Sequence, residues 1–175
     1  MESEAINAAD RTLKLLAGAR RAHPQPPPAG SPGERDGLAR FAELFAGLRE
    51  DRIERLADGV YHPDVVFDDT LKTVRGIAAL RAYLIDGARA TEDCQVAIDE
   101  VTRTEAGEHL LRWRMMIRFR RFAKGRDTWS AGMSHLRLAA DGRVAYHQDY
   151  WNAAEGLFQH VPVLGWGIRA IVRRL

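Results

Sequence analysis

Three polar residues near the ends of two strand-like segments have the types and spacing needed for acid/base chemistry. Asp69 closes the segment 60–69, which is rich in β-branched and aromatic residues. His147 and Asp149 lie two apart in a second such segment, so they share one face of a strand. At this spacing a carboxylate can orient or charge an imidazole. We take Asp69 as the candidate base, His147 as the group acting on the substrate oxygen, and Asp149 as the residue orienting His147.

Each of these residues also has a purely structural interpretation, and the sequence leaves both open. Asp69 is either an acid/base group or the cap of a turn after its strand. His147 and Asp149 either line a site or are satisfied within the sheet by groups such as Tyr61 and Ser134. There is no HExxH motif and no second histidine at a fixed helical spacing, so we expect neither a metal nor a cofactor.

Apolar side chains accompany the candidate residues. In the segment 109–122, apolar residues from Leu111 to Phe119 alternate with four arginines, at 112, 114, 118 and 120. One face of this strand is therefore apolar, and the other is expected to face solvent, paired with Asp99 and Glu100. The expected pocket-lining residues are Phe41, Tyr61, Trp113, Met115, Ser134, Leu136 and Trp151.

Helical patterns precede strand patterns along the chain. Apolar residues at spacings of three and four predict helices over 36–48, 51–58 and 76–87. Segments joined by short Gly-containing turns predict an antiparallel meander of strands over 95–103, 109–122, 127–138 and 143–151. Such an order is typical of an α+β architecture in which helices cover one face of a sheet.

The two ends of the chain differ from this central domain, residues 36–155. Residues 1–35 predict a short helix over 4–21 followed by a flexible Pro-rich linker. Residues 156–175 predict an amphipathic helical tail with apolar and arginine residues. That tail either closes the domain or packs on a partner, or else makes weak contact with a membrane surface.

Composition limits the classes of partner and compartment. The 175 residues include 26 basic and 24 acidic ones, with no continuous basic tract, so nucleic-acid binding is not expected. A single cysteine, Cys94, excludes an internal disulfide and favours the reducing cytoplasm. The start of the chain has no secretory signal pattern, and no apolar run approaches the roughly 20 residues that cross a bilayer.

Three stretches, YHPDVVFDDTLKTVRG, SHLRL and GRVAYHQDYW, resemble the nuclear transport factor 2-like superfamily, especially its ketosteroid isomerase-like and SnoaL-like branches. The resemblance covers about residues 36–151. It implies a cone-shaped, curved antiparallel sheet wrapped around three helices, the cystatin-like fold. It also implies a small hydrophobic ligand inside the cone and a homodimer that packs sheet against sheet.

Carried over by position, Asp69 falls where ketosteroid isomerases place their proton-shuttling carboxylate. The positions of the isomerase oxyanion donors hold Phe41 and Ser134, which departs from the steroid-isomerase pattern. The resemblance therefore implies a cofactor-independent isomerase or cyclase acting on a small apolar carbonyl or polyene-like molecule. The alternative is a non-catalytic ligand-binding or accessory protein, related to lipids and peripheral to a membrane.

Overall fold

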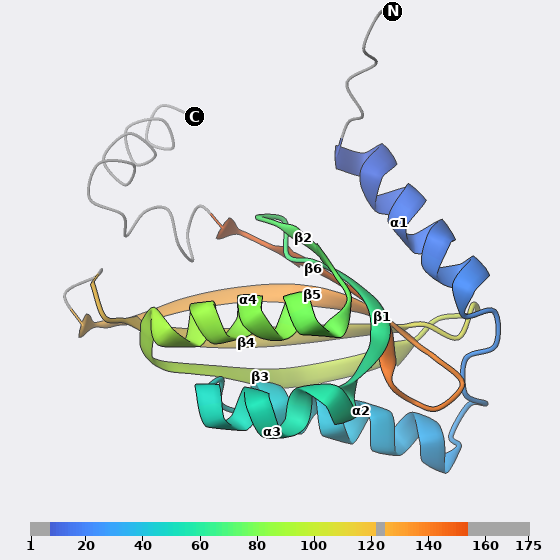
Figure 1. Ribbon diagram of the computed structural model, residues 1–175, viewed down its shortest axis with the longest axis horizontal. Coiled ribbons are helices and arrows are strands. Elements are labelled where there is room, and N and C mark those ends of the chain that lie inside the picture. The colour runs from blue at the N-terminus through green and yellow to red at the C-terminus, as the bar shows by residue number, and fades with distance from the viewer. Residues whose placement is uncertain (1–7, 122–124, 154–175) are drawn as a thin grey trace, which may run out of the picture.

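The computed structural model describes residues 8–121 and 125–153, which form four helices and six strands (Figure 1). The order is α1 (Ala8–Ala22), α2 (Pro32–Phe45), α3 (Glu50–Val60), β1 (Tyr61–Asp68), β2 (Thr73–Arg75), α4 (Ile77–Arg89), β3 (Thr91–Arg103), β4 (His109–Phe119), β5 (Asp127–Leu138) and β6 (Val144–Trp151).

The strands form one sheet with the order β2-β1-β6-β5-β4-β3. Strands β3 to β6 pair antiparallel with their neighbours, which confirms the predicted meander. The β1 strand pairs parallel with β6, placing Phe67 beside His147 and Asp68 beside Gln148. The sheet is therefore mixed at this one pairing, and residues 80 positions apart in the chain lie next to each other.

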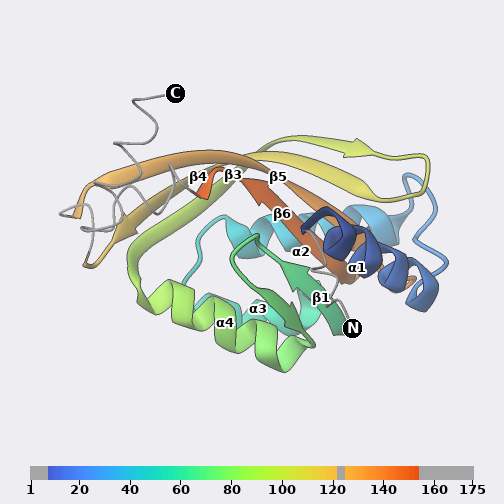
Figure 2. The same ribbon diagram turned by 90° about the horizontal axis from the view of Figure 1, so that it is seen from above.

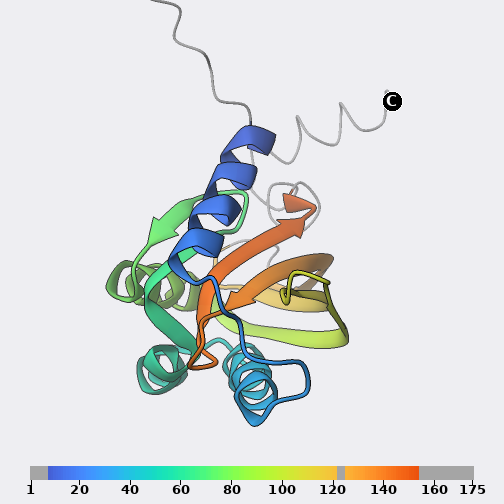
Figure 3. The ribbon, with the colours of Figure 1, turned by 90° about the vertical axis from the view of Figure 1, so that its right-hand side faces the viewer.

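The sheet is strongly curved and remains open (Figures 2 and 3). Helices α2, α3 and α4 pack against its concave face, and α1 lies against β6 on the other face. These observations confirm the predicted α+β cone, in which three helices fill the curve of the sheet. None of the described helices is long and apolar enough to cross a membrane.

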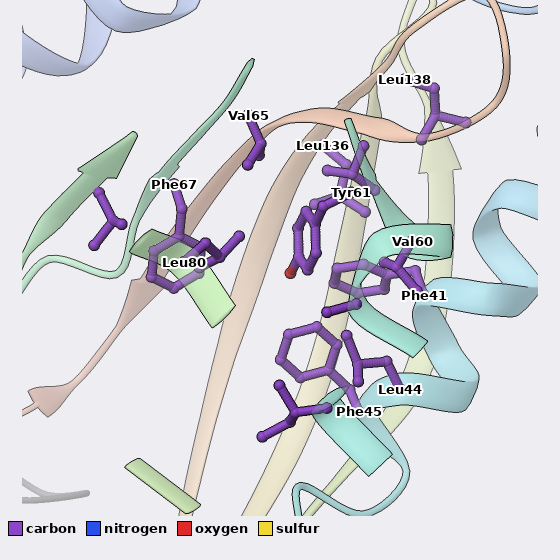
Figure 4. Close-up of a cluster of buried hydrophobic side chains, with 14 of the residues drawn as sticks. Phe41, Leu44, Phe45, Val60, Tyr61, Val65, Phe67, Leu80, Leu136 and Leu138 are labelled. Atoms are coloured by element: carbon purple, nitrogen blue, oxygen red, sulfur yellow. The ribbon is translucent and has the colours of Figure 1, made fainter. Parts of the chain in front are cut away.

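The main core lies where α2 and α3 meet the sheet near the start of β1 (Figure 4). Phe41 and Phe45 of α2 pack there beside Tyr61 of β1 and Leu136 of β5. Fully burying one large apolar side chain stabilises the fold by about 1.5–3 kcal/mol. This cluster fixes the angle of α2 to the sheet, and so the shape of the space above it.

The segment before the central domain is more structured than the sequence predicted. Helix α2 begins at Pro32, because Ser31 caps it by accepting a hydrogen bond from the Glu34 amide, and proline suits the first helical position. The boundary predicted at residue 36 therefore falls inside this helix. The segment after α1 is also attached to the sheet, because the Arg137 guanidinium on β5 donates hydrogen bonds to the carbonyls of His23 and Pro24.

Several element ends also differ from the sequence prediction. Helix α3 continues through Asp58 and Gly59, and α4 continues through Asp86 and Gly87, because packing on the sheet outweighs the weak helix propensity of glycine. The short strand β2 was not predicted. The predicted tail, residues 156–175, lies outside the described residues.

Candidate functional site

A cavity of about 340 Å³ lies between the helices and the concave face of the sheet. Its wall is mostly apolar and comes from α2, α4 and strands β1 and β3 to β6. The apolar lining includes Phe41, Phe45, Leu48, Phe67, Leu84, Val96, Ile98, Trp113, Met115, Ile117, Phe119 and Trp151. The polar side chains on this wall are few, so each of them can be examined for chemistry.

Hydrogen bonds link side chains of β4, β5 and β6 into one polar cluster on the cavity wall. The Trp113 indole donates to Ser134 Oγ at 2.9 Å, and the Ser134 hydroxyl donates to Asp149 Oδ1 at 2.5 Å. Nε2 of His147 lies 2.8 Å from the same Asp149 oxygen. Asp149 thus contacts Ser134 and His147, and no arginine or lysine lines the described cavity. The predicted contact between His147 and Asp149 is present.

His147 lies behind Asp149 and is almost fully enclosed. Its side chain is 1% exposed, compared with 16% for Asp149. Its Nδ1 is 2.9 Å from the Tyr61 hydroxyl. Burial, reinforced by the nearby charge of Asp149, raises the pKa of Tyr61 well above its ordinary value, so this hydroxyl keeps its proton. A neutral His147 that carries its proton on Nε2 satisfies both contacts, because Asp149 can only accept.

The second polar group is built around Asp69, directly after β1. Asp69 Oδ1 accepts hydrogen bonds from the amides of Leu71 at 3.0 Å and Lys72 at 2.9 Å. The other oxygen, Oδ2, accepts from the Tyr83 hydroxyl at 2.5 Å. Burial, together with the hydrogen bond to Asp69, raises the pKa of Tyr83, which therefore remains a donor. Asp69 thus caps a turn, as one of its two interpretations predicted, and it also lines the cavity.

The parallel pairing of β1 with β6 brings the two carboxylates to the same wall. Asp68, the last residue of β1, pairs with Gln148 of β6, so Asp69 just after β1 and Asp149 within β6 both follow this pairing, and both line the cavity. The Trp151 indole donates to the Asp69 carbonyl at 2.8 Å and fixes the end of β6 against this turn. The arrangement offers two carboxylates with neutral donors in apolar surroundings.

The structure brings most of the sequence-predicted site residues together. Asp69, His147 and Asp149 line the cavity, as do five of the seven expected pocket residues: Phe41, Trp113, Met115, Ser134 and Trp151. Two expectations are wrong. Tyr61 lies one layer behind the wall and reaches the site only through its bond to His147. Leu136 is fully buried in the main core, because its position on β5 lies under α2 and α3.

Four polar or thiol side chains of the cavity lining were not named as site residues from the sequence: Tyr83, Asp86, Thr91 and Cys94. Tyr83 was assigned to the buried side of its helix, but the tyrosine hydroxyl in that apolar pattern was the signal that a donor enters the site. Cys94 also lines the cavity. Burial raises the pKa of its thiol to about 12, which leaves it protonated and poorly nucleophilic.

The opposite face of the sheet carries the charged residues, as predicted. Arg114 pairs with Asp99 at 2.8 Å, and Arg112 pairs with Glu100 at 3.3 Å. Asp68 is directed away from the cavity and accepts a hydrogen bond from the Thr73 hydroxyl. None of these groups lines the cavity wall among the described residues.

Comparison with known proteins gives one family match and a consistent set of folds. A family model described as a SnoaL-like domain matches residues 40–147. No curated protein gives a significant match.

Three solved structures illustrate the likeness. An NTF2-like protein of unknown function from Exiguobacterium sp. 255-15 is 21% identical, with a TM-score of 0.57 over 66% of this chain and 98% of its own. A protein of ketosteroid isomerase-like fold from Catenulispora acidiphila DSM 44928, solved with trimethylamine, is 14% identical, with a TM-score of 0.59 over 69% and 88%. A SnoaL-like polyketide cyclase homologue from Jannaschia sp. CCS1 is 17% identical, with a TM-score of 0.54 over 70% and 89%. At these identities the likeness establishes the fold alone.

Proposed function

The chain belongs to the SnoaL-like domain family, and on that premise we propose that it is a cofactor-independent acid/base enzyme of the isomerase or cyclase type. Its substrate is a small, largely apolar molecule with a carbonyl group. The observation that carries this proposal is the pair of carboxylates, Asp69 and Asp149, on one wall of a mostly apolar cavity, to which α4 adds a third carboxylate, Asp86.

The size and lining of the cavity support the substrate class. A volume of about 340 Å³ lies at the lower end of the range typical of small-molecule sites. Aromatic side chains such as Phe67, Trp113 and Trp151 contribute to its wall and favour a flat, apolar substrate. The same side chains exclude water, which strengthens every electrostatic interaction at the carboxylates.

The geometry favours different roles for His147 and Asp149 from those predicted from the sequence. Both nitrogens of His147 are already in contact with protein groups, and its ring is enclosed by Phe41, Phe45 and Phe67. Asp149 is the more exposed member of the pair. We therefore assign Asp149 to the catalytic residues and make His147 a positioning residue that orients it.

Proton transfer through these groups balances without an oxidant or a reductant. One carboxylate removes a proton from a carbon next to the substrate carbonyl, and the electron pair moves onto the carbonyl oxygen as an enolate. The same carboxyl then returns the proton to another carbon of the substrate. For a substrate with a second carbonyl, the enolate carbon instead adds to that carbonyl carbon and closes a ring, the C=O π electrons move to its oxygen, and the carboxyl gives its proton to this alkoxide. The Tyr83 hydroxyl is the nearest neutral donor to Asp69 and can stabilise the negative charge as it shifts from carboxylate to substrate.

A second function, ligand binding without turnover, is favoured by one specific observation. Every polar group named at the site is already hydrogen-bonded within the protein: Asp69, Tyr83, Ser134, His147 and Asp149. A fully satisfied wall can hold an apolar ligand without reacting with it. The experiment must therefore separate binding from chemistry.

The test combines native mass spectrometry of gently purified protein with proton exchange in D₂O. A panel of cyclic ketones and enones is incubated with the protein, and deuterium uptake next to the carbonyl is followed by mass spectrometry. We expect Asp69→Asn or Asp149→Asn to slow this exchange by at least about 100-fold, a typical contribution of an acid/base group. Asp58→Asn, which changes an exposed carboxylate paired with Arg81, is the matched control.

The outcomes distinguish the two functions. A co-purified apolar molecule that is lost in Trp151→Ala, without exchange in any protein, supports the binding protein and overturns the enzyme. Exchange at wild-type rates in both carboxylate variants also overturns it.

We also propose that the chain forms a homodimer through the outer face of its sheet. Large apolar side chains are exposed there beside the arginines of β4: Trp129 and Met133 on β5, and Tyr150 on β6. Mass measurement of Trp129→Glu against the unmodified protein tests this interface, because a monomer is expected for the variant alone. The buried Cys94 thiol fits the reducing cytoplasm as the compartment.

A further inference from the structure

Three side chains that commonly bind transition metals converge outside the cavity. His62 and Asp64 lie two apart on β1, so both point to the face of the sheet away from the cavity. His23 follows the end of α1, which packs on that same face. One ligand atom from each of the three side chains lies within 4.8 Å of the other two.

The three groups already share one acceptor. Nε2 of His23 is 3.0 Å from Asp64 Oδ1 and 3.2 Å from Oδ2. Nδ1 of His62 also contacts Asp64 Oδ1. The two imidazole rings lie edge to face, with centroids 4.5 Å apart. Neighbouring ligand atoms on one tetrahedral metal ion lie about 3.3 Å apart when metal–nitrogen bonds are about 2.0 Å, so modest side-chain rotation would admit an ion.

The backbone of this cluster is held in place from both sides. The Arg137 guanidinium donates to the His23 carbonyl at 2.8 and 2.6 Å, which fixes the residue after α1 to the sheet. His62 lies between core residues Tyr61 and Val65, whose burial fixes the start of β1. The ligand set is therefore preorganised by contacts that do not depend on the metal.

From this geometry we infer that His23, His62 and Asp64 form a binding site for a divalent first-row transition metal such as Zn²⁺. Two imidazole nitrogens and one carboxylate oxygen are ordinary ligands for this ion, and they leave one position for water. The ring nitrogens that face Asp64 would bind the metal without a proton, so a proton on either of them moves to the other nitrogen of its ring or is released to solvent. No metal was expected from the sequence, because it contains no HExxH motif and no second histidine at a fixed helical spacing.

Charged side chains near the three ligands both favour and oppose the binding of a cation. Asp64 supplies a carboxylate that already contacts both imidazoles. Asp141 also interacts electrostatically with His62. Lys14, Arg21 and Arg75 line the neighbouring hollow and oppose a cation, which sets the affinity below that of a site without them.

The site would clamp the N-terminal segment to the cone. His23 belongs to the connection after α1, whereas His62 and Asp64 belong to β1, some 40 residues later. A metal joining them closes a loop of chain and stabilises the docking of α1 on β6. This inference is independent of the chemistry proposed for the cavity.

Calorimetric titration of the full-length, tag-free protein with ZnCl₂ tests the site. We expect binding of one ion per chain, with an affinity at least about tenfold weaker in His23→Ala, His62→Ala and Asp64→Asn. Asp58→Asn is the matched control, because it removes an exposed carboxylate elsewhere and should bind like the unmodified protein. Circular dichroism of each variant without metal verifies that folding is unchanged.

Two further readouts make the result specific. With Co²⁺ in place of Zn²⁺, the visible spectrum should report a tetrahedral ion in the unmodified protein and none in His62→Ala. Amide hydrogen exchange across α1 should slow on adding Zn²⁺, again only with His62 present. Absence of stoichiometric binding, or equal binding in all three ligand variants, overturns the site; unchanged exchange in α1 overturns its role as a clamp.

Discussion

Two imidazole–carboxylate networks lie on opposite faces of the same sheet, and they differ in what surrounds them. On the concave face His147 contacts Asp149 at 2.8 Å, and the pair borders the apolar cavity. On the other face His135 contacts Glu108 at 2.9 Å, beneath the end of α1. The contact between ring and carboxylate is nearly the same in both.

The surroundings of Glu108 are those of a structural ion network. Arg20 donates two hydrogen bonds to it at 2.7 Å each, and Arg137 adds a third at 3.2 Å. Both oxygens of Glu108 are thus used by cations, and the side chain is only 1% exposed. Asp149 instead accepts from Ser134 and His147, and it keeps a partly open face toward the cavity.

The difference teaches that a histidine beside a carboxylate does not by itself mark an active site. What distinguishes the two networks is the charge balance and the space next to the carboxylate. A carboxylate held by arginines fastens one element to another, whereas one held by neutral donors beside a cavity retains the ability to exchange a proton. Substitutions in each network separately test this distinction.

The largest effect is expected from Glu108→Ala. The substitution leaves Arg137, which is 4% exposed, buried without its carboxylate. Breaking a buried pair by removing one partner costs about 3–5 kcal/mol of unfolding free energy. Urea unfolding followed by circular dichroism measures the loss. If Glu108→Ala lowers the unfolding free energy no more than Asp149→Asn, the variant discussed below, the distinction between the two networks is wrong.

A smaller loss is expected from Gly132→Ala, which acts on the cavity side. A Cβ at this position would lie 2.5 Å from Trp113 ring carbons and 2.8 Å from the Tyr150 carbonyl. The indole cannot move freely, because it donates to Ser134. We expect a loss of about 1–3 kcal/mol in unfolding free energy, as for other overpacked sites.

The accompanying readout is ligand retention in native mass spectrometry. A displaced Trp113 should reduce retention in Gly132→Ala. Unchanged stability and retention would show that the cavity wall is less rigid than its contacts indicate. Gly59→Ala, where nothing lies within 4 Å of the added atom, is the control.

Asp149→Asn is expected to change the unfolding free energy little and to slow proton exchange at the substrate strongly. The amide keeps the shape of the carboxylate, so the loss should be about 1 kcal/mol, the net value of a hydrogen bond. Proton exchange at the substrate should nevertheless fall, as proposed above. Parallel measurement of unfolding and exchange verifies this split, and a stability loss as large as that of Glu108→Ala would contradict it.

The smallest perturbation is acidification of the unmodified protein. Burial by itself raises the pKa of Glu108, but hydrogen bonds from Arg20 and His135 outweigh it, so the pKa is lowered. A carboxyl group with a lowered folded pKa stabilises the fold above its unfolded pKa and loses this contribution as the pH falls through the folded value. Unfolding free energy should therefore decline progressively below about pH 4.5.

Glu108→Gln isolates this contribution from that of the other acids. Glu34 also has a lowered pKa, because hydrogen bonds from Gly30, Arg103 and His109 outweigh the effect of its burial, so some decline should persist in the variant. The decline should be shallower than in the unmodified protein. Identical pH profiles for the two proteins would show that Glu108 is not the group that responds.

Much of the architecture could be predicted from local patterns. The alternation from Leu111 to Phe119 identified the apolar and the solvent-exposed faces of β4, and the pairing of Arg114 with Asp99 followed from it. Two parts of the architecture were not predicted because their local signals are short. Ser31 and Pro32 start α2 inside the predicted linker, and β2 has only three residues, too few for a periodic signal.

The candidate site, too, was predicted only in part from local patterns. The shared strand face of His147 and Asp149 was evident from their spacing, because side chains alternate along any strand. The roles within the pair were not evident, because they depend on burial. Only the fold enclosed His147 more fully than Asp149 and placed the Tyr61 hydroxyl behind it.

The sequence alone specified the order of the elements apart from β2, and the two faces of the sheet, because these follow from periods of two and 3.6 residues. It also singled out the three acid/base candidates, by residue type and position. The tertiary structure alone decided which carboxylates share a wall, which histidines meet at Asp64, and which acid is neutralised by arginines. Those outcomes depend on the parallel pairing of β1 with β6 and on the docking of α1. Both are contacts between residues far apart in the chain, and no local pattern encodes them.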